Sequence, residues 1–272
     1  MTPIVSFVNQ KGGVGKTSTT LGIASAALTS SLKVLVVDTD PQANATAALG
    51  AGDHVEFDLN DLIEANTNSV NAVQEVITPS SWSETIDVLP ASLDLAKRDG
   101  DTTPMVEFRL RKALQLVAPS YDLILVDCSP SVGKLVMSSL IASTHVIVVT
   151  EPSAPALAGV ENLRDTISAI QEYGNPELEV AGVVVNRSNN TREARFRIDE
   201  LQEALGSDVL RPHIPSRSIV SEAMGAQQPV HAYLSRSRDV SEIYDKLLKQ
   251  IISTGKQTAD NARSDLGGGA RQ

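Results

Sequence analysis

Short runs of mostly apolar residues recur along the chain, separated by longer stretches in which apolar residues return with a helical period. Runs of this kind, rich in valine, isoleucine and leucine, are typical of strands buried on both faces of a parallel sheet. The predicted strands are residues 4–8, 34–37, 123–126, 146–149 and 180–185, with a weaker candidate at 86–89.

Helical patterns fill the stretches between these strands. The predicted helices are residues 17–30, 106–117, 133–142, 154–172 and 191–205. Alternating strands and helices predict the α/β class, with a mostly parallel, twisted sheet and helices on both of its faces. Ligands bind such sheets at the carboxyl ends of the strands. We therefore expect functional residues in the loops that follow the strands.

The last periodic segment predicts an amphipathic helix over residues 239–252. Its apolar positions, expected to enter the core, are Val240, Ile243, Tyr244, Leu247, Leu248 and Ile251. Residues 253–272 are polar and contain three consecutive glycines, so we predict a disordered tail there. This organisation gives a single domain over residues 1–252 followed by the tail.

Composition narrows the class of protein. Of 272 residues only Cys128 is a cysteine, which argues against a disulfide framework and favours a reducing, cytoplasmic setting. No apolar run of about 18 residues or more predicts a membrane span, and the N-terminus lacks a signal-peptide pattern. The net charge of −10 argues against non-specific nucleic-acid binding by the molecule as a whole. The segment 187–238 differs, because it carries eight arginines, no lysine and six acidic residues.

A glycine-rich loop follows the first predicted strand, and residues 10–18 read Gln-Lys-Gly-Gly-Val-Gly-Lys-Thr-Ser. Such a turn before a helix directs backbone N–H groups and the positive helix end at an anion. Lys16 can then reach nucleotide phosphates, and the Thr17 hydroxyl can bind Mg²⁺. A ligand-free tight corner is the alternative, and it accounts poorly for three glycines in four positions. The predicted nucleotide-binding residues here are Lys11, Gly12, Gly13, Val14, Gly15, Lys16, Thr17 and Ser18.

This loop departs from the usual P-loop spacing. Gln10 stands where the first glycine is expected, and a second lysine, Lys11, follows it. The loop resembles the deviant Walker A motif of the ParA/MinD superfamily of P-loop ATPases. That resemblance implies that Lys11 reaches across an ATP-sandwich homodimer to the partner's phosphates, as an arginine finger supplied in trans does. The cofactors it implies are ATP and Mg²⁺.

Acidic residues end two of the predicted strands. Asp38 and Asp40 follow 34–37, where a plain turn is the alternative interpretation, and Asp127 follows 123–126. Carboxylates at the carboxyl ends of neighbouring parallel strands can order metal-bound water or the attacking water. The first segment resembles the family's Walker A′ motif, which implies that Asp40 positions the hydrolytic water while Asp38 supports the Mg²⁺ and lysine network. The second resembles a Walker B strand. The resemblance thus assigns Lys11, Lys16 and Asp40 to catalysis, and Thr17, Asp38 and Asp127 to the metal.

Two later segments extend the resemblance to the base. Asn186 ends the strand 180–185 at the family's adenine-reading position, and its amide offers both the donor and the acceptor that the adenine edge requires. An ordinary turn asparagine is the alternative. Pro215 lies in a loop that resembles the one closing over the base. Cys128, beside Asp127, is expected to be a buried thiol without chemistry.

DNA contacts are the part of the resemblance that this sequence supports least. ParA proteins hold nucleoid double-stranded DNA without sequence preference, through arginines that neutralise phosphates. The candidates here are Arg192, Arg195 and Arg217. The family loop Ile-Pro-Arg-x-x-Arg has Ser216 and Ile219 at its arginine positions. The alternative is a set of surface arginines paired with neighbouring acidic residues.

The resemblance as a whole implies a P-loop NTPase fold and an ATP-dependent dimerising switch for chromosome or plasmid partitioning. Slow hydrolysis would reset it, a ParB-like protein would stimulate it, and DNA binding would place it on the nucleoid. We expect neither an N-terminal helix-turn-helix domain nor a membrane-targeting C-terminal helix. One alternative is a ParA-like positioning or division regulator that acts through protein partners without DNA. Another is a metabolic ligase on the same fold, whereas a nitrogenase-reductase-like cluster needs more cysteine ligands than this chain has.

Overall fold

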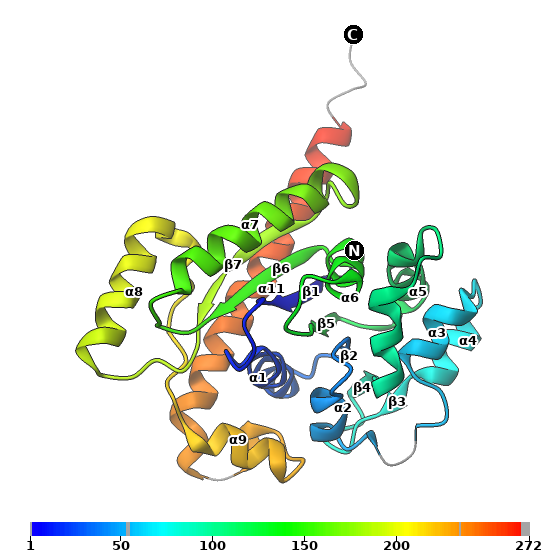
Figure 1. The fold of residues 1–272 in the computed structure, drawn as a ribbon. Helices are drawn as coiled ribbons and strands as arrows, with labels where there is room; N and C mark the ends of the chain where they lie inside the picture. Colours follow the sequence, from blue (N-terminus) through cyan, green and yellow to red (C-terminus); the bar gives the residue numbers. More distant parts are fainter. Residues whose placement is uncertain (1, 53–54, 234, 268–272) are drawn as a thin grey trace.

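A computed structural model describes residues 2–52, 55–233 and 235–267 (Figure 1). Within these ranges the centre of the molecule is a seven-stranded sheet in the order β3-β4-β2-β5-β1-β6-β7. The strands are β1 Ile4–Val8, β2 Val34–Asp38, β3 Thr78–Pro79, β4 Ile86–Leu89, β5 Leu123–Asp127, β6 His145–Thr150 and β7 Glu179–Val185. Neighbouring strands are parallel except β3 and β4. The predicted α/β class is confirmed, and every predicted strand is present.

Burial on both faces explains the continuous apolar runs. In β2, Leu35 and Val37 enter one core while Val34 and Val36 enter the other, and all four side chains are fully buried. Successive side chains of a strand point to opposite faces of the sheet. Each face therefore needs its own apolar helical layer, and the sequence cannot alternate between apolar and polar residues along these strands.

Two helical layers supply that cover (Figure 1). One core is built with α3 Leu59–Ala65, α4 Val70–Val76, α5 Arg109–Val117, α6 Lys134–Ala142, α7 Ala156–Tyr173 and α8 Arg192–Leu205. The other is built with α1 Lys16–Thr29, α2 Asn44–Ala48, α9 Ser218–Gly225, α10 Val230–Tyr233 and α11 Arg238–Gly267. Short 3₁₀ helices complete the connections: η2 Leu93–Gly100, η3 Val106–Phe108, η4 Ala118–Ser120, η5 Gly206–Asp208 and η6 Ser235–Ser237.

Several elements were not predicted from the sequence. They are α2, α3, α4, α9, α10 and the short antiparallel strand β3. All six span eight residues or fewer, too short for a period to stand out. α3 carried a usable signal, because Asp58 and Asp61 form a reciprocal capping box around its first turn.

The C-terminal helix is longer than predicted. α11 contains the predicted apolar positions, and Val240, Tyr244 and Leu247 are fully buried. It continues past residue 252 to Gly267, so the helix end placed at 252 was wrong. Residues 253–267 hold no proline and several good helix formers, which lets the helix continue. Residues 268–272 of the predicted tail lie outside the described residues. In the described ranges we find no helix with the length and apolarity needed to cross a bilayer.

Tyr244 fixes α11 against α1, the helix that starts at the glycine-rich loop. Its ring occupies the space that a Cβ at Gly22 would need. Its hydroxyl lies 3.3 Å from the carbonyl oxygen of Ser18, to which it donates. Further along α1, Ser25 Oγ lies 2.7 Å from Nδ1 of His231 in α10. The helix behind the loop is therefore anchored along most of its length.

Replacement of Gly22 by alanine tests this anchoring. The change gains helix propensity of about 1 kcal/mol but forces a methyl group into the fully buried Tyr244 ring, and overpacking of this kind costs about 1–3 kcal/mol. We expect Gly22→Ala to lower the free energy of unfolding in urea. Gly159→Ala, in α7, is the matched control, because a Cβ added at that glycine would meet nothing within 4 Å, and it should be stabilising. Equal stabilisation by both changes would contradict the packing described.

Candidate functional site

The loop between β1 and α1 has the backbone of an anion cradle. Gly13 and Gly15 adopt φ angles of 81° and 91°, in the left-handed region that favours glycine. A Cβ at Gly15 would also overlap the side-chain amide of Asn186. The positive φ angles and the close approach of Asn186 direct the chain from the loop into α1. This 14-residue helix has its N-terminus at a pocket. Such a helix end attracts phosphate.

The pocket has a volume of about 870 Å³, which is within the range of small-molecule sites. It lies at the carboxyl ends of the strands, where the predicted motif loops meet. The predicted residues that line it are Gly13, Gly15, Lys16, Thr17, Ser18, Asp40, Asn186, Pro215 and Arg217. It also contains residues that were not predicted, among them Arg187, Val220 and Met224. The sequence analysis assigned no role to these three residues.

Asp38 and Asp127 face each other across two neighbouring strands. They are register partners at the ends of β2 and β5, and both are fully buried. Burial raises the pKa of each carboxyl group above its ordinary value, and the adjacent carboxylate raises it further for Asp127. Two buried acids this close cannot both stay ionised without a cation. The fold therefore strongly favours a cation beside Asp38 and Asp127.

One oxygen of the Asp127 carboxylate is available to bind a metal ion. Oδ1 of Asp127 accepts from the Thr20 hydroxyl at 3.2 Å, and the nearby Thr17 side chain partly offsets the rise in the pKa of this carboxyl group. Its Oδ2 is buried and has no partner among the described residues. Carboxylate and hydroxyl oxygens are ligands that Mg²⁺ prefers. Thr17 and Asp127 therefore fit Mg²⁺, although the described residues contain no group of three or more His, Cys, Asp or Glu side chains placed to hold a metal ion.

Asp38 is engaged differently. Its Oδ1 accepts from the backbone N–H of Asp40 at 3.1 Å, and its Oδ2 accepts from both the N–H and the hydroxyl of Thr46 at 2.8 Å. The carboxylate thus closes the turn that carries Asp40, a role that supports the site from behind. Thr46 was missed by the sequence interpretation, because a threonine in a five-residue helix has no distinctive pattern.

The two lysines of the loop have opposite environments. Lys16 is buried and close to Asp127 and Asp40, and burial lowers its pKa while these carboxylates oppose the shift. Lys11 is half-exposed, and its Nζ lies 2.6 Å from Oε1 of Glu151, just beyond β6. Its backbone N–H donates to Oδ1 of Asn9 at 2.8 Å, which fixes the start of the loop. Lys16 therefore lines this molecule's own pocket, whereas Lys11 is exposed and does not line it.

Asn186 contacts the loop from the far side of the pocket. It is buried, and its amide donates to the carbonyl oxygen of Val14 at 2.9 Å. Pro215 is brought beside it by a bridge to Ser188. Arg187 follows Asn186 with a φ of 52° and is exposed at the pocket. The structure places both predicted base-contacting residues at one end of the pocket, and contact with adenine stays a prediction.

Cys128 and the candidate DNA arginines complete the set. Cys128 is buried, as predicted, and this burial raises the pKa of its thiol to about 11, which disfavours the reactive thiolate. Arg192 and Arg195 are exposed at the start of α8, and Arg195 donates to the carbonyl oxygen of Asn190. Arg217 pairs with Asp239 at 3.0 Å.

Local pairing and burial limit the arginine surface. Arg197, beside Arg195 on α8, pairs with both Glu193 and Glu200. Ile219, at one of the positions where the family loop carries arginine, is a buried core residue. Arg192 and Arg195 are thus the predicted DNA contacts for which the structure shows no ion pair among the described residues.

A phosphate cradle at a helix start, two strand-end carboxylates and a buried lysine define a P-loop ATPase site. A family model described as an AAA domain matches residues 2–180. A second, for 4Fe-4S iron sulfur cluster binding proteins of the NifH/frxC family, matches residues 112–264. The chain belongs to the ParA/MinD superfamily of P-loop ATPases. Its single cysteine does not match the multi-cysteine ligand sets of iron–sulfur clusters.

Individual relatives narrow this class. The chain is 32% identical to the sporulation initiation inhibitor protein Soj of Bacillus subtilis, over 94% of this chain and 100% of that protein. It is 31% identical to the chromosome partitioning protein ParA of Caulobacter vibrioides, over 92% of this chain and 94% of that protein. A solved cobyrinic acid a,c-diamide synthase of Mycobacterium smegmatis, with bound ADP and magnesium, is 28% identical with a TM-score of 0.76, covering 93% of this chain and 97% of that one.

The raised pKa of Asp127 predicts how metal-dependent nucleotide affinity varies with pH. A carboxyl group with a raised pKa stays protonated at low pH and ionises only as the pH passes through that value. Only the ionised form binds a hard cation. With the pKa of Asp127 raised to about 8, we therefore expect ATP affinity in Mg²⁺ to strengthen by up to about 100-fold between about pH 6 and about pH 9, measured by calorimetry. Asp127→Asn controls for the titration of ATP itself, and an identical pH dependence in that variant would contradict the assignment.

Proposed function

We propose that this protein is an ATP-driven switch in chromosome or plasmid partitioning, which closes as a homodimer around ATP and reopens after hydrolysis. The observation that carries the proposal is the placement of the two lysines: Lys16 is buried in the molecule's own cradle, and Lys11 is exposed outside the pocket. Soj and ParA are similar to this chain over nearly their whole length, which supports the partitioning role.

Hydrolysis at this site would use groups that the fold already orients. The loop N–H groups and Lys16 would bind the β- and γ-phosphates, and Asp40 would hold the attacking water in line. Mg²⁺, held by Thr17 and Asp127, would neutralise charge on the phosphate oxygens. Asp40 is suited to the water because it is almost fully buried at the pocket and its Oδ1 accepts from the N–H of Gln42 at 2.9 Å. That bond holds the carboxylate in one orientation.

Lys11 would complete the site of the partner molecule. In the single chain its ammonium is bound to Glu151, so closure of a dimer requires Lys11 to exchange this carboxylate for the partner's phosphates. Both groups are partly exposed, so the ion pair is weak and easily exchanged. The dimer would place a cation against developing charge, which makes catalysis depend on association. A ParB-like partner would act by stimulating this step.

Lys11→Ala separates the two lysine roles. We expect the variant to bind ATP with nearly unchanged affinity, since Lys16 remains, but to stay monomeric by light scattering and to lose hydrolysis by at least about 10³-fold. Asp40→Ala is the matched comparison, because it keeps Lys11 and removes the water-positioning carboxylate. It should dimerise with ATP and remain dimeric. An ATP-dependent dimer of Lys11→Ala would overturn the proposal for Lys11.

DNA binding in the ATP state is the remaining element of the proposal, and the exposed Arg192 and Arg195 are its best support. We expect retention on non-specific duplex DNA with ATP, loss with ADP, and a steep fall with salt. Arg195→Ala should weaken retention and reduce the salt slope by about one. Arg164→Ala, on α7 and paired with Asp208, is the control. No retention in either nucleotide state would instead favour a positioning regulator that acts through protein contacts.

A further inference from the structure

A short 3₁₀ segment outside the pocket connects the two carboxylate loops. We call residues 90–101 the η2 strut, which contains η2 and follows β4. At its first end, the backbone N–H of Ala91 donates to the hydroxyl of Thr46 at 3.0 Å. The same hydroxyl donates to Oδ2 of Asp38. This end of the strut is thus one side chain away from the turn that carries Asp40.

The other end of the strut contacts the loop that follows Asp127. Oδ1 of Asp99 accepts from the backbone N–H of Leu135, in the first turn of α6, at 3.0 Å. The Asp99 carboxylate fills the space where a Cβ at Gly133 would lie. Lys134 donates to the carbonyl oxygen of Asp101. Residues 128–133 are therefore held between Asp127 at one end and the strut at the other.

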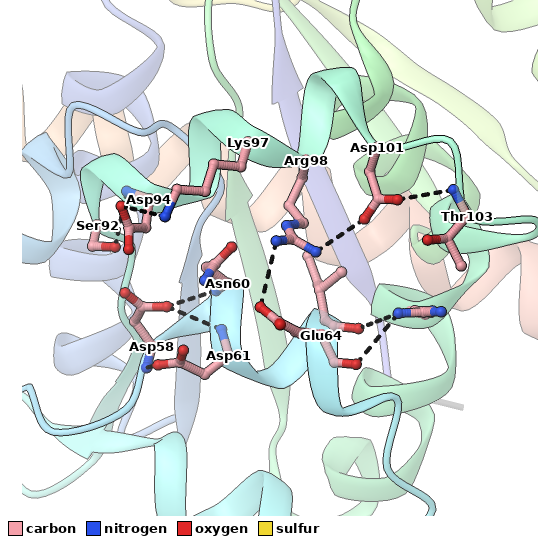
Figure 2. A network of polar contacts seen from close by, with 12 residues as sticks. Asp58, Asn60, Asp61, Glu64, Ser92, Asp94, Lys97, Arg98, Asp101 and Thr103 are labelled. Atoms are coloured by element: carbon pink, nitrogen blue, oxygen red, sulfur yellow. Dashed lines mark hydrogen bonds and ion pairs between the residues drawn. The ribbon is translucent and has the colours of Figure 1, made fainter.

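The strut is itself fixed to the body of the protein. Leu95 is fully buried in the core. Arg98 bridges Asp101 at 2.9 Å and Glu64 of α3 at 3.5 Å, and Figure 2 shows these contacts beside the capping box of α3. The N–H of Leu59, at the start of α3, donates to the carbonyl oxygen of Pro90 at 2.9 Å. Such a braced segment can transmit a displacement from one end to the other.

We propose that Thr46 and Asp99 are positioning residues that hold the Asp40 turn and the Asp127 loop at a fixed separation through the η2 strut. The inference rests on the proposed hydrolytic function and extends it to residues that do not line the pocket in the described chain. The physical reason is that in-line attack requires a fixed distance and orientation between Asp40, which would hold the water, and Asp127, which would hold the metal. A displacement of about 1 Å can cost about 10²-fold in rate.

Kinetics of matched variants test the positioning roles. Thr46→Val keeps the size of the side chain and removes the hydroxyl that joins Ala91 to Asp38. We expect kcat for ATP to fall by about tenfold or more while KM changes by less than about threefold, because the glycine loop and Lys16 are unaffected. Thr46→Ser should restore kcat. Asp99→Ala should show the same split, and Asp94→Ala, an exposed acid on the same segment, should not.

Gly133→Ala offers a second route to the same contact. The added methyl would displace the Asp99 side chain. Its effect on kcat should therefore be large in the wild type and small in Asp99→Ala. Additive effects of these two changes, or equal losses in Asp94→Ala and Asp99→Ala, would overturn the role of Asp99. Failure of Thr46→Ser to recover kcat would overturn that of Thr46.

Nucleotide-free measurements distinguish failure of the strut from failure of the proposed function. Trp82 is the only tryptophan of the chain, and its indole N–H donates to the carbonyl oxygen of Ala48 at the end of α2, the helix that carries Thr46. Asp99→Ala should shift its emission, and Thr46→Val should speed hydrogen exchange in residues 129–136. Unchanged emission and exchange would sink the strut whether or not ATP is hydrolysed. If both change while the wild type hydrolyses no ATP, the strut stands and the proposed function fails.

Discussion

The register between β2 and β5 is the constraint on which the site depends. It sets Asp38 beside Asp127, both fully buried, at the edge of the sheet that the glycine loop covers. Buried carboxylates are costly unless positive charge or hydrogen bonds compensate them. Asp38 is compensated by donors from its own turn, whereas Asp127 keeps an oxygen without a partner among the described residues, beside Lys16 and the Thr17 hydroxyl. Asp38 is thus satisfied by hydrogen bonds within its own turn, whereas the proposed cation would bind the unpartnered oxygen of Asp127.

The same principle separates the two lysines. Lys16 is buried, so its charge is matched to groups inside the pocket, and it serves the molecule that carries it. The Lys11 side chain is exposed and forms an ion pair with Glu151, an interaction that solvent weakens. A weak, exposed ion pair suits a side chain that, in the proposed dimer, exchanges this carboxylate for the partner's phosphates. The difference between these residues lies in burial, since both are lysines of one short loop.

Much of the fold followed from elementary patterns. The apolar runs located the six predicted strands because burial on both faces forbids alternation, as the split of β2 between two cores shows. The glycine loop, Asp40 and Asp127 could be located because phosphate chemistry requires particular residues at particular spacings. Short elements such as α2 and β3 were not predicted, since their sequences are too short to show a helical or strand period and their conformation depends on the elements packed beside them. The extension of α11 beyond residue 252 was not predicted, because the polar composition suggested disorder. The helix propensity of these residues is nevertheless sufficient for the helix to continue.

The sequence by itself determined the class of site, because glycines, lysine, threonine and aspartates in this order can build a phosphate cradle and little else. Only the tertiary structure decided which of these groups face inward and which face outward. Pairing of Asp38 with Thr46, of Lys11 with Glu151 and of Asp99 with the start of α6 joins residues that are eight, 140 and 36 positions apart. Such contacts arise from strand order and helix docking, and no local pattern encodes them.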